Sequence, residues 1–245
     1  MKLKKTVKFS LSTYKKPLFI YYSIIIGCLL VGLLAMNLNT DHTVKIGGLE
    51  LTTIIFVFVM GLTSFRSELY LYLQNGISRK TACISYFITA VVVTLFMAFV
   101  ESMCYTIIGK NSTFQSAFLQ VYTEMSNRNF LYIVATSFLW NFFVYFAASI
   151  VGYCIAALYY RMNRVLKLSV SIGVPVTFLI ILPLIDEYLA KGAIGDFAKR
   201  AALFIVGVNG TTYHPIHWMI FCLIVTLLSE GISYRLVKEA VIKSK

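Results

Sequence analysis

Three residues inside long apolar stretches carry side chains that could do chemistry: Glu101, Asn141 and Glu230. Carboxylates at membrane depth can carry protons or coupling ions, and an amide can bind a polar group of a transported molecule. Each residue also has a structural interpretation. Glu101 lies about 30 Å along its helix and Glu230 lies one turn before Tyr234, so both can be interfacial carboxylates. Asn141 is deeper, where an amide usually bonds to a neighbouring helix, and it is our candidate for a substrate path.

The sequence offers little for catalysis or metal binding. It contains no G-x-x-x-x-G-K-[ST], H-E-x-x-H or G-x-S-x-G motif, so no ATPase, metalloprotease or serine hydrolase signature is present. His214 and His217 lack a third ligand, and with Trp218 we expect them at a membrane interface. The five cysteines show no C-x-x-C spacing, which argues against a disulfide framework or a zinc site. We therefore predict no catalytic residues, cofactor or metal in this chain.

The composition is typical of an integral membrane protein. The 245 residues are 59% hydrophobic and 13% charged, with a mean hydropathy of +0.80, whereas soluble domains have about 25% charged residues. Crossing a hydrocarbon core of about 30 Å takes roughly 20 helical residues. We predict a single all-α membrane domain of six transmembrane helices, at residues 17–36, 47–65, 82–108, 130–160, 166–185 and 216–234.

The basic residues predict the orientation. Sixteen of the 22 lie in cytosolic segments if the N-terminus is inside. These are Lys2, Lys4, Lys5, Lys8, Lys15, Lys16, Arg66, Arg79, Lys80, Arg161, Arg164, Lys167, Arg235, Lys238, Lys243 and Lys245. The outer segments hold Lys45, Lys110, Arg128, Lys191, Lys199 and Arg200. The positive-inside rule therefore places both termini in the cytosol. The net charge of +12 then reflects topology and attraction to anionic lipid, and no nucleic-acid partner is needed.

The first residues, 2–16, combine lysines with a helical apolar stripe and lack a signal-peptide cleavage site. The stripe consists of Leu3, Val7, Leu11, Tyr14 and Leu18. This pattern predicts a basic amphipathic helix on the inner leaflet, and the alternative is a frayed basic tail.

The most informative segment, residues 64–80, joins spans two and three. Phe65, Leu69, Tyr72 and Leu73 recur on one helical face, and Asn75-Gly76 then ends the helix. A simple connection would need only polar turn residues. A capped amphipathic helix at the membrane surface instead predicts a site for a partner to hold.

Two other spans and one loop carry local signals. In span four, Ala148, Gly152 and Ala156 form a small-xxx-small row that lets another helix approach closely. In span five, Pro175 and Pro183 predict a kink or a helix end that bends toward a cavity.

The loop 186–215 is too long for a turn. Its helical apolar spacing, at Ile194, Phe197, Ala201, Phe204, Ile205 and Val208, predicts an outer amphipathic helix. The apolar core of that helix is too short to cross the membrane.

Together these elements resemble the ABC-2 type permease subunit of ATP-binding-cassette exporters. The resemblance covers nearly the whole chain. Its most specific part is residues 65–80, because members of that family often carry a run similar to Asn75-Gly76-Ile77-Ser78-Arg79-Lys80. The remaining features are the basic entry helix, six spans with both termini inside, and the outer apolar hairpin.

The resemblance implies that residues 65–74 form a coupling helix that docks in a groove of a partner ATPase, with a second contact at residues 159–166. The coupling residues it suggests are Phe65, Arg66, Glu68, Leu69, Tyr72, Leu73, Gly76, Arg79, Arg161 and Arg164. It also implies ATP and Mg on that partner, and a second permease chain, identical or different, that helps to enclose the path. An ATPase that closes on ATP would pull the docked helix, and rigid helices would pass the movement on.

Substrate and function are expectations at this stage. The 16 Tyr and 19 Phe favour a hydrophobic or amphipathic substrate such as a peptide or antibiotic, exported across the cell membrane, expected to be a bacterial plasma membrane. An ion-coupled secondary transporter would need a site near mid-membrane, and no acidic residue is convincingly placed there. An intramembrane enzyme would need a nucleophile or metal set. The only dense charged cluster, Asp186-Glu187 beside Lys191, lies in an outer loop.

Overall fold

The computed structural model describes residues 2–38, 46–108, 114–188, 191–209 and 212–238. Predictions that concern Lys45, Lys110, Lys243 and Lys245 lie outside these residues. Within the described ranges, six helical segments are long and apolar enough to cross a membrane, so the prediction of an all-α multi-pass protein is confirmed. They are α1 (Lys2–Leu38), α2 (Leu49–Gln74), α3 (Arg79–Ile108), α5 (Phe130–Arg161), the segment Arg164–Tyr188 and α9 (Pro215–Lys238).

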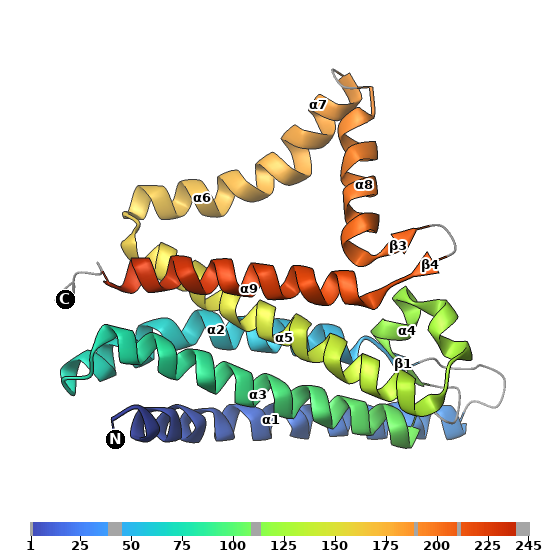
Figure 1. Ribbon diagram of the computed structural model, residues 1–245, viewed down its shortest axis with the longest axis horizontal. Helices are drawn as coiled ribbons and strands as arrows, with labels where there is room; N and C mark the ends of the chain where they lie inside the picture. Colours follow the sequence, from blue (N-terminus) through green and yellow to red (C-terminus); the bar gives the residue numbers. More distant parts are fainter. Residues whose placement is uncertain (1, 39–45, 109–113, 189–190, 210–211, 239–245) are drawn as a thin grey trace.

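In the described part of the chain, the long helices α1, α2, α3, α5 and α9 form a bundle, and a helical hairpin projects from it (Figure 1). In the bundle α5 packs against α2, α3 and α9, while α1 lies along α3. The hairpin rises through α6 (Arg164–Val176), the π-helical segment η3 (Thr177–Ile181) and α7 (Leu182–Tyr188), and returns through α8 (Ala193–Val206). No residue of α6, η3, α7 or α8 is buried. These helices are therefore held mainly by their connections and by the contact of α8 with α9.

Short elements close one end of the bundle. Strand β1 (Ile46–Gly47) pairs in parallel with β2 (Phe114–Gln115), and β3 (Val208–Asn209) pairs antiparallel to β4 (Thr212–Tyr213). Between β2 and α5 lie α4 (Ala117–Val121) and η2 (Thr123–Asn127). Phe118 and Tyr122 of this connection are buried beside Trp140 of α5. We call this the far end.

The opposite end of the bundle holds the first turns of α1, the turn 75–78, the turn 162–163 and the last turn of α9 (Figure 1). We call it the basic end. Arg79 fixes part of it, because its guanidinium donates a hydrogen bond of 2.6 Å to the carbonyl of Lys238. The basic end thus gathers the segments whose lysines and arginines predicted a cytosolic location. Which membrane face this end meets remains a prediction.

The N-terminal segment differs from its prediction. Residues 2–16 do not form a separate surface helix but continue into span one as the single helix α1. At 1.5 Å per residue its 37 residues measure about 55 Å, well beyond the hydrocarbon core. Thr6, Ser10 and Tyr14 are buried on one stripe, so hydroxyl groups as well as apolar ones hold these turns against the bundle. The exposed lysines occupy the other side of the helix.

The helix predicted between spans two and three is also not separate. Helix α2 runs without interruption from Leu49 to Gln74, because no glycine turn or proline separates residues 47–65 from 66–74. Its predicted end is confirmed: Gly76 adopts φ 64°, and Ile77 N–H donates a 2.9 Å bond to the carbonyl of Tyr72. Glycine is favoured in that left-handed conformation and closes the last turn.

The hairpin contains the expected interruptions. The predicted outer amphipathic helix corresponds to α8, and two N–H groups in its first turn bond to the side chain of Asp186. That carboxylate accepts 2.8 Å bonds from the N–H groups of Ile194 and Gly195. Pro183, which has no N–H, follows the π-helical segment η3, and the chain bends between α6 and α7 (Figure 1). Asp186, which belongs to the charged cluster considered as an enzyme site, therefore has a structural role at the start of α8.

Candidate functional site

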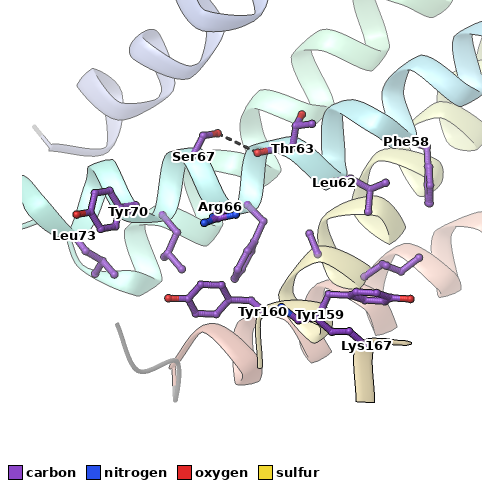
Figure 2. A pocket seen from close by; sticks show the side chains of 14 residues that line it. Phe58, Leu62, Thr63, Arg66, Ser67, Tyr70, Leu73, Tyr159, Tyr160 and Lys167 are labelled. Carbon is purple, nitrogen blue, oxygen red and sulfur yellow. Dashed lines mark hydrogen bonds between the residues drawn. The ribbon is translucent and has the colours of Figure 1, made fainter. Parts of the chain in front are cut away.

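A groove of about 1230 Å³ opens at the basic end between α2 and α5 (Figure 2). Its walls come from the second half of α2, the last turns of α5 and the start of α6. The lining residues are Phe58, Leu62, Thr63, Phe65, Arg66, Ser67, Leu69, Tyr70, Leu73, Ile155, Ala156, Tyr159, Tyr160 and Lys167. The two segments assigned by resemblance to a partner ATPase, residues 65–74 and 159–166, thus meet in space.

Aromatic contacts hold the two walls of this groove together. The Phe65 ring meets the edge of Tyr153 at a centroid distance of 5.2 Å and that of Tyr160 at 5.7 Å. Edge contacts of this kind are favourable because the positive rim of one ring faces the negative face of another. Ala156, from the small-residue row, lines the groove one helical turn before Tyr160. Phe65 is therefore a packing residue between α2 and α5.

The apolar face predicted to enter a partner is buried within this chain, and this corrects the coupling-helix interpretation. Leu69 is 5% exposed and Tyr72 is 2% exposed, and both belong to a core with Phe65, Tyr86 and Tyr153. The hydroxyl groups of Tyr72 and Ser10 are hydrogen-bonded, which ties α2 to α1. Helical periodicity identifies a face that must be covered, but it does not say by which helix.

Glu68 likewise faces inward. The Tyr14 hydroxyl donates a 2.9 Å hydrogen bond to its Oε1, and Tyr14 also bonds to Ser64. A buried carboxylate requires such donors. Sequence reasoning missed Ser10, Tyr14 and Ser64 as partners. A usable signal was present, because Thr6, Ser10 and Tyr14 recur at four-residue spacing and place hydroxyls on one stripe of α1.

Other coupling candidates lie at the surface of the basic end. Arg66, Arg161 and Arg164 are exposed, and Leu73 is half-buried on the groove wall. Beyond the buried face of α2, the exposed residues near its end and in the following turn are Tyr70, Leu71, Gln74, Asn75, Gly76, Ser78 and Lys80. The surface that a partner can reach therefore centres on the turn that ends α2.

A polar cluster joins three helices closer to the far end. Glu101 of α3 accepts hydrogen bonds from the hydroxyls of Thr53 and Tyr145, which come from α2 and α5. Glu101 is thus bonded to neighbouring helices and is not solely an interfacial carboxylate. Glu50, which the sequence analysis did not single out, is also buried, and its Oε1 accepts a 3.0 Å bond from the N–H of Ala117 at the start of α4. Its role there is to hold the far-end connection.

Two candidates each have one oxygen without a described hydrogen-bond donor. Asn141 is buried, and its Oδ1 accepts no hydrogen bond from the described residues. Asn141 is not among the residues that line the groove. Glu230 is half-buried on α9, and its Oε2 has no described donor either. The structure therefore does not join these two side chains to the groove.

The remaining members of the small-residue row contact different partners. Gly152 is buried against α2, whereas Ala148 packs beside the cluster that contains Trp140.

At the far end, Tyr122 donates a 2.8 Å bond to the carbonyl of Val206, which links the α4 connection to α8. Burial raises the pKa of Tyr122 to about 12, so its hydroxyl stays protonated and remains a donor at neutral pH.

The histidines and cysteines supply no metal site in the described part of the chain, where no three His, Cys, Asp or Glu side chains converge. The five cysteines are free thiols. His217 packs its ring against Phe204 and His214, with centroid distances of 5.9 Å in each case.

Comparison with known proteins yields no assignment: no protein-family model, curated protein or solved structure matches this chain. The resemblance to ABC-2 type permeases therefore depends on the order of the elements and on the run from Asn75 to Lys80. Any function for the chain must be argued from its own geometry.

Proposed function

We propose that this chain is the membrane-spanning permease subunit of an ATP-driven exporter, with ATP and Mg bound by a separate ATPase subunit. The observation that carries the proposal is the continuity of α2 from the far end to the turn 75–78. A partner that moves this turn would move one rigid helix along its whole length. Since α2 packs closely on α5, the movement would pass to a second span.

The proposed ATPase contact differs from the one suggested by sequence periodicity. It uses the exposed surface around the turn 75–78, with Leu71, Gln74 and Lys80, and the neighbouring residues Arg161 and Arg164, which flank the turn 162–163. Leu69 and Tyr72 are buried beneath this surface and hold α2 against the rest of the chain. The cationic side chains fit an acidic patch on the partner, and such complementarity favours encounter and orientation.

A second permease chain, identical or different, completes the proposed transporter. Helices α6 and α7 bury no residue in this chain, so their apolar sides are free to meet lipid or another subunit. The export path would lie between two such chains. A hydrophobic or amphipathic cargo such as a peptide suits an interface lined by aliphatic and aromatic side chains. We place the assembly in a cell membrane, expected to be a bacterial plasma membrane.

Ion-coupled transport is the alternative function, and two half-buried carboxylates inside spans favour it. Glu230 has an oxygen without a described donor, and Glu101 lies in a polar cluster shared by three helices. Such carboxylates can load and release a proton. The two functions differ in energy source, which makes them separable by experiment.

The proposal is tested by substituting an exposed leucine at each end. Leu71→Asp changes a side chain that is 37% exposed beside the turn, and Leu131→Asp changes one that is 82% exposed at the far-end start of α5. Tagged protein is purified in mild detergent, and copurifying chains are sequenced. We expect a chain with Walker A and signature motifs to accompany the wild type and Leu131→Asp but not Leu71→Asp. Equal recovery of that chain with both variants would contradict the proposed contact.

A further inference from the structure

We propose that the groove between α2 and α5 is a binding site for one anionic phospholipid, with the headgroup between Arg66 and Lys167 and the acyl chains along Phe58 and Leu62. This inference concerns a ligand of the chain itself and does not require a partner ATPase. It depends on the shape, the charge and the depth of the groove.

The size and lining of the groove suit a lipid better than a small polar ligand. Its volume of about 1230 Å³ exceeds the range of roughly 300–1,000 Å³ that is usual for small-molecule pockets. Aliphatic and aromatic side chains form most of its surface, including Phe58, Leu62 and Ile155. An acyl chain can cover such a surface without leaving a polar group unpaired.

The charge of the groove selects an anion. Arg66 lies on α2 and Lys167 on α6, on opposite walls, and the described lining includes no Asp or Glu (Figure 2). The nearest carboxylate along α2, Glu68, points to the other side of the helix, where Tyr14 donates a hydrogen bond to it. The two cations are therefore not neutralised by a lining carboxylate, and they can pair with a phosphate.

The depth of these residues matches the layers of a membrane. Arg66 follows Leu49, the first residue of α2, by 17 positions, which corresponds to about 26 Å of helix. Because the hydrocarbon core is about 30 Å thick, a span that begins at one surface brings Arg66 close to the opposite interface. Phe58 and Leu62 lie one to two turns deeper, at the level of acyl chains. Tyr159 and Tyr160 supply the amphipathic rings that prefer the interface.

The inference is tested by native mass spectrometry of the chain purified in detergent with dioleoylphosphatidylglycerol or dioleoylphosphatidylcholine. We expect one molecule of the anionic lipid to be retained, with a preference on the order of tenfold over the zwitterionic lipid. The double variant Arg66→Gln/Lys167→Gln should lose this preference. The matched control Lys199→Gln/Arg200→Gln removes the same charge from α8 and should retain it.

Two further measurements distinguish a specific lipid site from annular lipid and from a site for the headgroup alone. Thr63→Trp, which fills the groove from an exposed position on α2, should reduce retention of the anionic lipid on the order of tenfold while leaving the unfolding temperature unchanged. Glycerol 1-phosphate should not displace the lipid, since the headgroup alone lacks the acyl contacts. Equal retention of both lipids would indicate ordinary annular lipid only. The proposal would be overturned by that result, by an unchanged preference in Arg66→Gln/Lys167→Gln, by undiminished retention in Thr63→Trp, or by displacement of the lipid by glycerol 1-phosphate.

Discussion

Gly61 of α2 and Gly152 of α5 lie where the backbones of these two helices face each other without an intervening side chain. A Cβ atom added to Gly61 would lie 2.9 Å from the backbone nitrogen of Tyr153, and one added to Gly152 would lie 3.2 Å from the backbone carbon of Phe58, with the facing carbonyl oxygens closer still. Backbone atoms of one helix thus occupy the space of a side chain on the other. Small residues permit such contact in membrane helices. This crossing holds α2 in direct backbone contact with α5.

The first prediction tests that crossing. Gly152→Ala should destabilise the protein by about 1–3 kcal/mol, because backbone must shift to admit the methyl group. Gly231→Ala on α9 is the matched control, since a Cβ there meets no atom within 4 Å. The control should be neutral or stabilising by about 0.5–1 kcal/mol, because alanine restricts the unfolded chain more than glycine does. The measurement is the unfolding free energy in detergent, and equal values for the two variants would show that the helices are not in close contact.

The second prediction separates the buried face of α2 from its exposed side. Leu69→Asp places an uncompensated charge in the core and should cost about 3–5 kcal/mol, with loss of folded protein. Leu71→Asp, two residues away and exposed, should change the unfolding free energy by less than about 0.5 kcal/mol. Folded yield by size-exclusion chromatography reports both. Normal folding of Leu69→Asp would return this residue to a partner-facing role.

The third prediction concerns orientation. After the five native cysteines are replaced, single cysteines are introduced at Gln74 and at Lys199, which are exposed at the basic end and on α8 respectively. The positive-inside rule predicts that Gln74→Cys resists a membrane-impermeant thiol reagent in intact cells and that Lys199→Cys reacts. Permeabilised cells provide the control, in which both should react. Labelling of Gln74→Cys from outside would reverse the topology.

The fourth prediction addresses the energy source. Glu101→Gln keeps an acceptor for one hydroxyl and offers a donor to the other, so the contacts with Thr53 and Tyr145 can persist. The single variants Glu101→Gln and Glu230→Gln should each retain substantial ATP-dependent transport of a hydrophobic peptide into vesicles that contain the partner ATPase. Ionophores that collapse the membrane potential and the pH gradient should have no effect. Transport that persists without ATP, and that the ionophores or either substitution abolish, would favour an ion-coupled carrier.

The sequence predicted the spans and the end of α2 because both depend on local properties. Apolar length determines which segments can cross, and Asn75-Gly76 supplies a left-handed position that ends a helix. The continuity of α2 could not be predicted in this way. Arg66 and Glu68 interrupt the apolar run, and the donor that satisfies Glu68 is Tyr14, 54 residues earlier in the chain.

The candidate site shows the same limit. Residues 65–74 and 159–166 were singled out from the sequence, yet the sequence could not show that residues from both segments line one groove with Lys167. Leu69 and Tyr72 would show the same helical periodicity whether they were buried against α1 and α5 or against another protein. Only the packing of distant helices distinguishes the two, and it leaves the turn 75–78 as the exposed surface.

If a nucleotide-binding partner contacts the end of α2, as we propose, photo-crosslinking from Gln74 should capture it. A photoreactive amino acid at Gln74 is activated in native membranes, with the same substitution at Lys199 as the control, and products are identified by mass spectrometry. We expect a crosslink from Gln74, absent from Lys199, to a chain that carries the G-x-x-x-x-G-K-[ST] motif, with a yield that changes on addition of non-hydrolysable ATP. The absence of such a chain at Gln74, or the same product from Lys199, would show that no ATPase docks specifically at the end of α2.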